Sequence, residues 1–145
     1  MGKRREGRQT AVQFLFQRDL SNCKMPEGLV DFWTICPVNL ATREFTTNLV
    51  LGVIAHQPEI DALISKHSAN YELHRIAAVD RNIIRVAIYE MFHCPEVPPV
   101  VSINEAIEIA KQYGAEESGK FVNGILDRIR KDISRPARSA AKPER

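Results

Sequence analysis

The fold of this chain is decided by the stretch VDRNIIRVAIYEM at residues 79–91. Its apolar side chains recur at intervals of three and four residues, and they are Ile83, Ile84, Ala87, Ile88 and Met91. Residues at this spacing lie on one face of an α-helix. Asp80 precedes the stripe and is of a residue type that caps helix N-termini, so we expect it at the N-cap. The stretch therefore predicts an amphipathic helix with one buried face.

The same periodicity continues on both sides of this stretch, without the sustained alternation of apolar and polar residues that is typical of strands. Further apolar stripes run through residues 12–20, 45–53, 60–64, 103–110 and 121–129. Pro58 is well placed to open a helix, because proline fits the first helical position. A chain of 145 residues with this pattern predicts an all-α fold, a compact bundle of six or seven helices.

Several helix ends carry their own signals. The run Ser102-Ile103-Asn104-Glu105 matches the capping-box pattern, which predicts that a helix begins at Ser102. Gly114 predicts the end of that helix, in the left-handed conformation that glycine adopts readily. The last helix is expected from about residue 117 to 133. Residues 134–145 have no apolar anchor, and we expect this tail to be disordered.

Charge is distributed unevenly along the chain. Residues 1–8 contain four basic side chains and one acidic side chain, and residues 134–145 have the same balance, whereas residues 9–133 contain 12 basic and 16 acidic side chains. We therefore divide the chain into a basic N-terminal arm (1–8), an acidic helical domain (9–133) and a basic tail (134–145). Arginines at a helix start can pair with phosphates or stack on bases, so the arm is a candidate RNA contact.

The motifs of the common enzyme and metal classes are missing from the sequence. The three cysteines follow no C-x-x-C spacing, and no phosphate-binding glycine motif occurs. We expect no cysteine or carboxylate at ligand spacing beside the histidines, which are His56, His67, His74 and His93. We expect no catalytic site, no metal and no cofactor. The chain has no apolar run near 18 residues and no signal peptide, which predicts a cytoplasmic protein that does not enter a membrane.

The run EESGKFVNG at residues 116–124 is a candidate RNA contact at a helix start. The free N–H groups of a helix N-terminus favour a bound phosphate, Lys120 adds a cation, and Asn123 could read a base edge. Phe121 could offer a ring on which a base stacks. In the alternative interpretation, residues 117 and 118 only cap the helix, Phe121 belongs to the core, and residues 123 and 124 let two helices approach closely.

Residues 79–85 also allow two interpretations. Asp80 can simply cap its helix, with Arg81 or Arg85 paired to nearby acids. Charged residues ahead of a long apolar stripe can equally frame a surface that receives a partner. The residues alone leave this choice open.

Four segments together resemble the NusB family of transcription antitermination factors. They are the AVQFLF that follows the arginines, VDRNIIRVAIYE (79–90), INEAIEIAKQYG (103–114) and SGKFVNGILD (118–127). The resemblance implies two three-helix subdomains and no enzymatic activity. It also implies binding of the single-stranded boxA element of nascent ribosomal RNA jointly with NusE, a small-subunit ribosomal protein, in an antitermination complex with RNA polymerase.

The resemblance assigns roles by position. The residues that it places at the RNA are Arg4, Arg5, Arg8, Lys120, Phe121 and Asn123, with Glu117 at the edge of this set. It places Phe16 and Asp80 against NusE. Glu6 interrupts a run that is often uniformly basic in the family, and Phe16 stands where a tyrosine hydroxyl can occur in relatives. Because the body of the chain is acidic, we expect the free protein to bind RNA weakly.

Three alternatives stay open at this point. A NusB-like domain also occurs as the RNA-positioning part of an RNA cytosine methyltransferase, although 145 residues leave no room for a methyltransferase core. A helical protein–protein adaptor without an RNA role would have a similar pattern. A surface that receives NusE could also be covered by a second copy of the chain, which would make the free protein a homodimer.

Overall fold

The computed structural model describes residues 3–21, 27–35, 37–68 and 72–133. Within these ranges the regular structure consists of seven α-helices and one 3-10 turn, which confirms the all-α prediction. The tail of residues 134–145, expected to be disordered, lies outside the described residues. In the described part of the chain, no helix combines the length and the apolar character that crossing a membrane requires.

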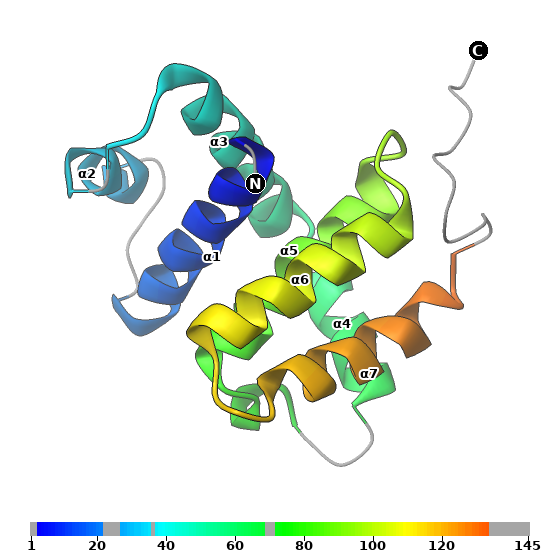
Figure 1. Cartoon of the computed structure of the whole chain (residues 1–145). Helices are drawn as coiled ribbons and strands as arrows, with labels where there is room; N and C mark the ends of the chain where they lie inside the picture. The colour runs from blue at the N-terminus through cyan, green and yellow to red at the C-terminus, as the bar shows by residue number, and fades with distance from the viewer. Residues whose placement is uncertain (1–2, 22–26, 36, 69–71, 134–145) are drawn as a thin grey trace.

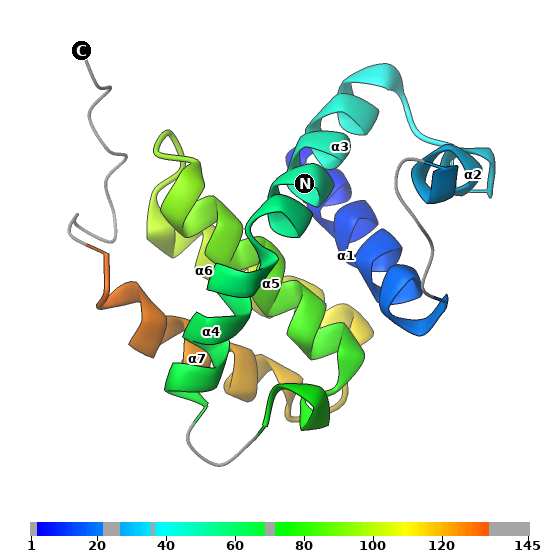
Figure 2. The ribbon, with the colours of Figure 1, turned by 180° about the vertical axis from the view of Figure 1, so that it is seen from behind.

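The helices are arranged in two groups that share one helix (Figures 1 and 2). The first group is α1 (Lys3–Ser21), α2 (Glu27–Ile35) and α3 (Leu40–Ala55), and the second is α4 (Gln57–His67), α5 (Ala78–His93), α6 (Pro99–Tyr113) and α7 (Ser118–Arg130). The 3-10 turn η1 (Leu73–Arg75) precedes α5. Helix α5 packs against α1 and α3 as well as α4, α6 and α7, so the second group has four α-helices where three were expected.

The stripe predicted on α5 is buried as expected. Each of its five apolar side chains is at most 2% exposed. Burying an isoleucine or methionine side chain stabilises a fold by about 1.5–3 kcal/mol, and four of the five are of these types, so α5 anchors the core. The rest of the α5 surface is largely covered as well, and it carries buried polar side chains such as Arg85 and Glu90, which are held by ion pairs.

Two predicted helix starts are wrong. The N-cap position of α5 is Ala77, so Asp80 is already in the first helical turn, where its carboxylate is used in a tertiary contact. Helix α6 begins at Pro99 and not at Ser102, because proline fits the first helical turn and its ring presets the backbone. Ser102 is buried inside the helix, and its predicted capping partner Glu105 turns toward α1.

Gly114 ends α6 as predicted, but for a different reason. Its backbone is extended, with φ −92° and ψ −173°, and is not left-handed. A Cβ at this position would lie 2.5 Å from Ser118 Oγ and 2.8 Å from the carbonyl oxygen of Ala110. The glycine is therefore required because α6 and the start of α7 approach closely there. Helix α7 itself begins at Ser118 and ends at Arg130, within the predicted range.

The predicted stripe of α1 is only partly correct. Val12 and Leu15 are buried, but Phe16 is half-buried and Leu20 is 68% exposed. Phe14 is buried instead and packs edge-to-face on Phe32 of α2, with ring centroids 5.3 Å apart. The C-terminal half of α1 therefore presents apolar side chains at the surface.

Candidate nucleic-acid interface

The basic start of the chain is part of a helix. Residues 3–8 form the first turns of α1 and are continuous with the rest of it, so they do not make a separate arm. The three arginines of this segment lie in three different environments. Arg4 is exposed, Arg5 is half-buried and Arg8 is 5% exposed.

Arg8 is used inside the protein. Its Nε and Nη2 donate to the two carboxylate oxygens of Glu90 on α5, at 2.7 and 2.8 Å, and its Nη1 lies 3.6 Å from Glu105 Oε1. The pair is nearly fully buried and joins α1 to α5. This geometry does not support the prediction that Arg8 contacts RNA, because its guanidinium faces carboxylates in the interior.

Arg5 is partly engaged in an ion pair within the protein and partly exposed. Its Nε and Nη2 donate to Glu105 of α6 at 2.9 and 2.6 Å, while about 30% of its side chain remains exposed. The hydrogen bond from Arg5, together with the charges of Arg5 and Arg8, outweighs burial and holds the pKa of Glu105 below its usual range. A phosphate that binds Arg5 would therefore have to compete with an ionised carboxylate.

Arg4 is the most accessible of the three. Its guanidinium carbon lies 5.5 Å from the centroid of the Phe45 ring on α3, a distance typical of a cation–π contact. Among the described residues, no carboxylate forms an ion pair with Arg4, and its side chain is exposed.

The second set of predicted RNA residues lies at the start of α7. Lys120 and Asn123 are exposed, and Phe121 is half-buried against the core. Helix α6 lies between this set and the start of α1 (Figure 1). It is linked to α1 by the Arg5–Glu105 pair and by a hydrogen bond of 2.9 Å from Gln9 to Gln112. The exposed predicted residues therefore flank one helix and do not form a single cluster.

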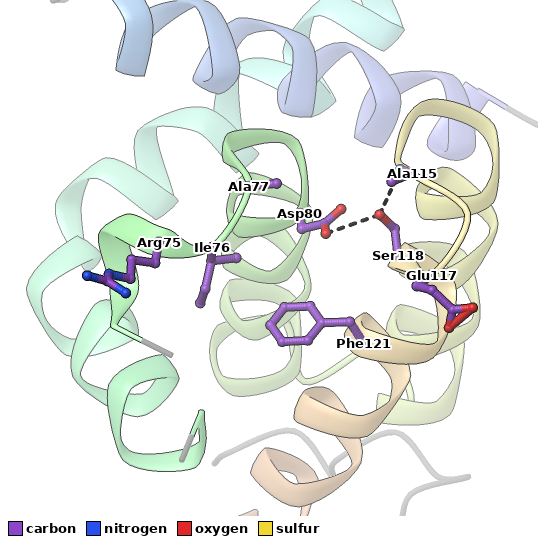
Figure 3. Close-up of a pocket in the computed structure, with 8 residues that line it drawn as sticks. All are labelled: Arg75, Ile76, Ala77, Asp80, Ala115, Glu117, Ser118 and Phe121. Carbon is purple, nitrogen blue, oxygen red and sulfur yellow. Dashed lines mark hydrogen bonds between the residues drawn. The ribbon is translucent and has the colours of Figure 1, made fainter. Parts of the chain in front are cut away.

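A pocket of about 200 Å³ opens between η1, the start of α5 and the start of α7 (Figure 3). Its lining residues are Arg75, Ile76, Ala77, Asp80, Ala115, Glu117, Ser118 and Phe121. The pocket thus brings together Phe121, predicted at the RNA, and Asp80, predicted at the partner. The ring of Phe121 extends from α7 toward Ile76 in the close-up view.

Asp80 has one satisfied and one unsatisfied oxygen. Oδ2 accepts a hydrogen bond of 3.1 Å from the Ser118 hydroxyl, and Ser118 Oγ accepts one of 2.9 Å from the backbone N–H of Ala115. Oδ1 is buried, and none of the described residues forms a hydrogen bond with it. Burial raises the pKa of Asp80, and the Ser118 hydrogen bond opposes this only in part. A buried acceptor left unpaired costs about 1–3 kcal/mol, which a donor entering the pocket would recover.

Phe16 belongs to an adjoining element. It lies one turn before Asp19 on α1, and Asp19 binds the first half of α5 through Arg81 at 3.1 Å, Arg85 at 2.9 Å and Asn82 at 3.0 Å. Arg85 also makes a two-bond contact with Asp61 of α4. Of the two interpretations left open for residues 79–85, the arginines therefore follow the first, since both are paired to acids.

One cluster was missed by the sequence analysis. His56, Glu59 and His93 lie together where α3, α4 and α5 meet. The expectation that no carboxylate stands at ligand spacing beside a histidine is wrong, because Glu59 follows His56 by three residues and its Oε1 lies 3.7 Å from His56 Nδ1. His93 is 37 positions further along the chain, so only the fold could add it.

Comparison with known proteins identifies the family. The model of the NusB family matches residues 5–131. The chain belongs to the NusB family. It is 45% identical to the transcription antitermination protein NusB of Desulfatibacillum aliphaticivorans, over 98% of this chain and 99% of that protein. It is also 45% identical to the NusB of Bacillus subtilis, over 90% of this chain and 97% of that protein.

Solved NusB structures have the same fold. The NusB of Thermotoga maritima superposes with a TM-score of 0.82 at 38% identity, covering 91% of this chain and 93% of that one. A crystal structure of the antitermination factors NusB and NusE in complex with double-stranded RNA contains a chain that superposes with a TM-score of 0.83 at 29% identity, covering 92% and 99%. These NusB relatives are antitermination factors, and the chain is accordingly not an enzyme.

Proposed function

We propose that this NusB-family chain binds the single-stranded boxA element of nascent ribosomal RNA jointly with NusE, within an antitermination complex that includes RNA polymerase. The observation that carries the proposal is the likeness, over 92% of the chain, to a protein solved together with NusE and RNA. The RNA methyltransferase alternative is less well supported, because the relatives reported above are antitermination proteins. Because the relatives reported above are bacterial, and bacteria transcribe in the cytoplasm, we propose that the protein acts there.

The proposed RNA surface consists of Arg4, Arg5, Lys120, Phe121 and Asn123, on the two sides of α6. Single-stranded RNA is bound by cations along its backbone and by stacking of its unpaired bases on planar side chains. Arg4 and Lys120 supply exposed charge, and the accessible part of Phe121 supplies a ring. Arg8 is omitted from this surface because it is buried against Glu90.

The proposed NusE surface consists of the pocket beside Asp80 and the exposed end of α1 around Phe16. A basic or amide side chain of NusE would donate to Asp80 Oδ1, which is buried and has no hydrogen-bond partner in the described part of the chain. Apolar side chains of NusE would cover Phe16 and the exposed Leu20. In the absence of NusE, a second copy of the chain could cover the same apolar end, which keeps the homodimer open as a state of the free protein.

A partner is needed for two reasons. The chain between residues 9 and 133 has more acidic than basic side chains, which repels phosphate at a distance. In addition, Arg5 is already held by Glu105. NusE would contribute further RNA contacts, so that the two proteins together bind boxA more tightly than either does alone.

The test is a titration of fluorescently labelled boxA RNA with the protein, with and without NusE, beside an RNA of the same length and shuffled sequence. We expect weak binding by the protein alone, tighter binding with NusE, and a preference for boxA over the shuffled RNA. Lys66→Ala, which removes an exposed cation from α4, serves as a matched control for Lys120→Ala and should leave binding unchanged. NusE binding that does not respond to boxA would favour the adaptor alternative.

A further inference from the structure

Three metal-ligating side chains converge at the junction of α3, α4 and α5. The ligand atoms of His56, Glu59 and His93 all lie within 4.8 Å of one another. The two imidazole rings are stacked, with centroids 3.9 Å apart and planes inclined by 20°. We call these three residues the histidine cluster. It shares no residue with the proposed RNA surface, and it is separate from the pocket beside Asp80, since Asp80 and His93 lie at opposite ends of α5.

The backbone fixes the position of each member of the histidine cluster. His56 is the single residue between α3 and α4; its N–H donates to the carbonyl of Gly52 at 3.1 Å, and its own carbonyl accepts from Ile60 N–H at 3.0 Å. Glu59 lies in the first turn of α4, three residues after His56. His93 is the last residue of α5. A ligand held by all three would therefore connect three helices.

An aromatic side chain supports the two imidazoles. Tyr89, one turn before His93, stacks on His93 with ring centroids 5.3 Å apart and lies 6.0 Å from the His56 ring. The Tyr89 ring contacts the backbone of Gly52, and a Cβ on Gly52 would overlap this ring. Glycine at position 52 thus lets α3 and α5 approach closely enough to bring the two histidines together.

We propose that the histidine cluster binds a divalent transition-metal ion of the zinc class, with water completing the coordination. Two imidazoles and one carboxylate are a ligand set that suits zinc, and three protein ligands leave one tetrahedral position open. In a tetrahedral zinc site the ligand atoms are about 3.3 Å apart, as bond lengths of about 2.0–2.1 Å require. Glu59 and His93 are exposed, so small side-chain rotations can close the present separations.

A bound ion would tie the α3–α4 junction to the end of α5, and hence the first helical group to the second. An ion that binds the folded state and not the unfolded state raises stability with its concentration. The proposal does not rest on the proposed RNA or NusE binding, and its failure would leave that function untouched.

The experiment is calorimetric titration of Zn²⁺ into chelator-treated protein, with the visible absorption of Co²⁺ as a second readout of ligand geometry. We expect one ion per chain, a rise in Tm that excess chelator reverses, and at least a tenfold loss of affinity in His56→Ala and in His93→Ala. His74→Ala is the matched control, because His74 is an exposed histidine whose Nε2 lies 3.3 Å from Glu72. It should keep the full affinity.

Circular dichroism of each variant without metal shows whether it is folded, and His93→Gln provides a milder change should His93→Ala unfold. The proposal is overturned if no ion binds, if His56→Ala and His93→Ala bind as well as the parent, or if His74→Ala loses affinity equally. It is also overturned if Cys94→Ser abolishes binding, since the neighbouring thiol and not the histidine cluster would then be the main ligand.

Discussion

Arg4 and Arg8 are separated by one turn of α1, yet their surroundings predict opposite effects of substitution. Arg8→Ala would leave Glu90, which is 1% exposed, without its partner. Removing one member of a buried ion pair destabilises a protein by about 3–5 kcal/mol. Arg4→Ala removes an exposed side chain, and such changes usually alter stability by no more than about 0.5 kcal/mol.

For RNA binding, the expected order is reversed: Arg4→Ala should have the larger effect and Arg8→Ala the smaller. Arg4→Ala should weaken boxA binding in the presence of NusE and reduce the slope of log affinity against log salt by about 0.7, the value for one phosphate contact on a single strand. Arg8→Ala protein that remains folded should keep the slope of the parent. Urea unfolding and RNA titrations at several salt concentrations measure both quantities. An unchanged slope in Arg4→Ala would contradict the RNA role of Arg4.

Phe121 and Val122 offer a matched pair on α7. Phe121 is half-buried and lines the pocket, whereas Val122 is fully buried. Phe121→Ala should lower the free energy of unfolding by less than the roughly 3–5 kcal/mol of a fully buried phenylalanine. It should weaken RNA binding in the presence of NusE by about 1–3 kcal/mol for each base that stacks on the ring.

Val122→Ala supplies the comparison for Phe121→Ala. It should cost stability through the cavity that it leaves, while the folded fraction binds RNA as the parent does. If Phe121→Ala behaves like Val122→Ala in both measurements, Phe121 is a core residue and has no place in the RNA surface.

At the scale of helices, the sequence predicted the packing faces better than the ends. The stripe of α5 could be read from spacing, because every third or fourth residue of a helix faces the same side. Asp80 and Ser102 were misplaced as caps because their side chains serve tertiary positions, one bonded to Ser118 and one buried. Residue type alone does not distinguish a local cap from a distant partner.

The site residues that could not be predicted are those whose role depends on contacts between helices distant in sequence. Arg8 was placed at the RNA together with the other arginines of the basic start, by its position in the family. Its partner Glu90 is 82 residues away, and no local pattern connects the two, so the ion pair could not be predicted. The exposure of Lys120 and Asn123 agrees with a surface role. The His56–Glu59 spacing was visible in the sequence, but His93 joins them only through the packing of α5 on α3.

The contact between α1 and α5 should become less stable at acidic pH. Burial alone would raise the pKa of Asp19, but the hydrogen bond from Asn82 and the charges of Arg85 and Arg81 hold it below its ordinary value. A carboxyl group whose pKa is lower in the folded state stabilises the fold above its unfolded pKa of about 3.9, and this contribution disappears as pH falls through the folded pKa.

Asp19→Asn should therefore be less stable than the parent at pH 7, and the difference should shrink as the pH falls below about 4. Urea unfolding across this pH range measures the effect. Asp31→Asn, which changes an exposed carboxylate on α2, is the control and should show little difference at any pH. A constant difference between Asp19→Asn and the parent would show that Asp19 stabilises the junction through packing and not through its charge.

At the scale of the whole molecule, NusE binding can be tested most directly by substitutions in the pocket beside Asp80. Asp80→Lys reverses a charge at the proposed NusE surface, and like-charge contacts at an interface cost several kcal/mol. We expect a large loss of NusE binding in calorimetric titration. Asp31→Lys, the same reversal on α2, should bind NusE as the parent does.

The stability of Asp80→Lys has to be followed in parallel, because Asp80 is buried and bonded to Ser118. Asp80→Asn keeps the shape of the side chain and removes only the charge, so it should fold normally and still lose part of the NusE affinity. Full NusE affinity in both folded variants would remove Asp80 from the partner surface.

The position of α5 between the two helical groups determines how the protein unfolds. Because α5 is packed against helices of both groups, neither group can separate without exposing its stripe to water. The two groups should therefore unfold in one cooperative transition, and the amide protons in the middle of α5 should exchange with deuterium only through global unfolding. Exchange followed by NMR would show these amides as the slowest in the protein, with those at the start of α1 exchanging much faster by fraying.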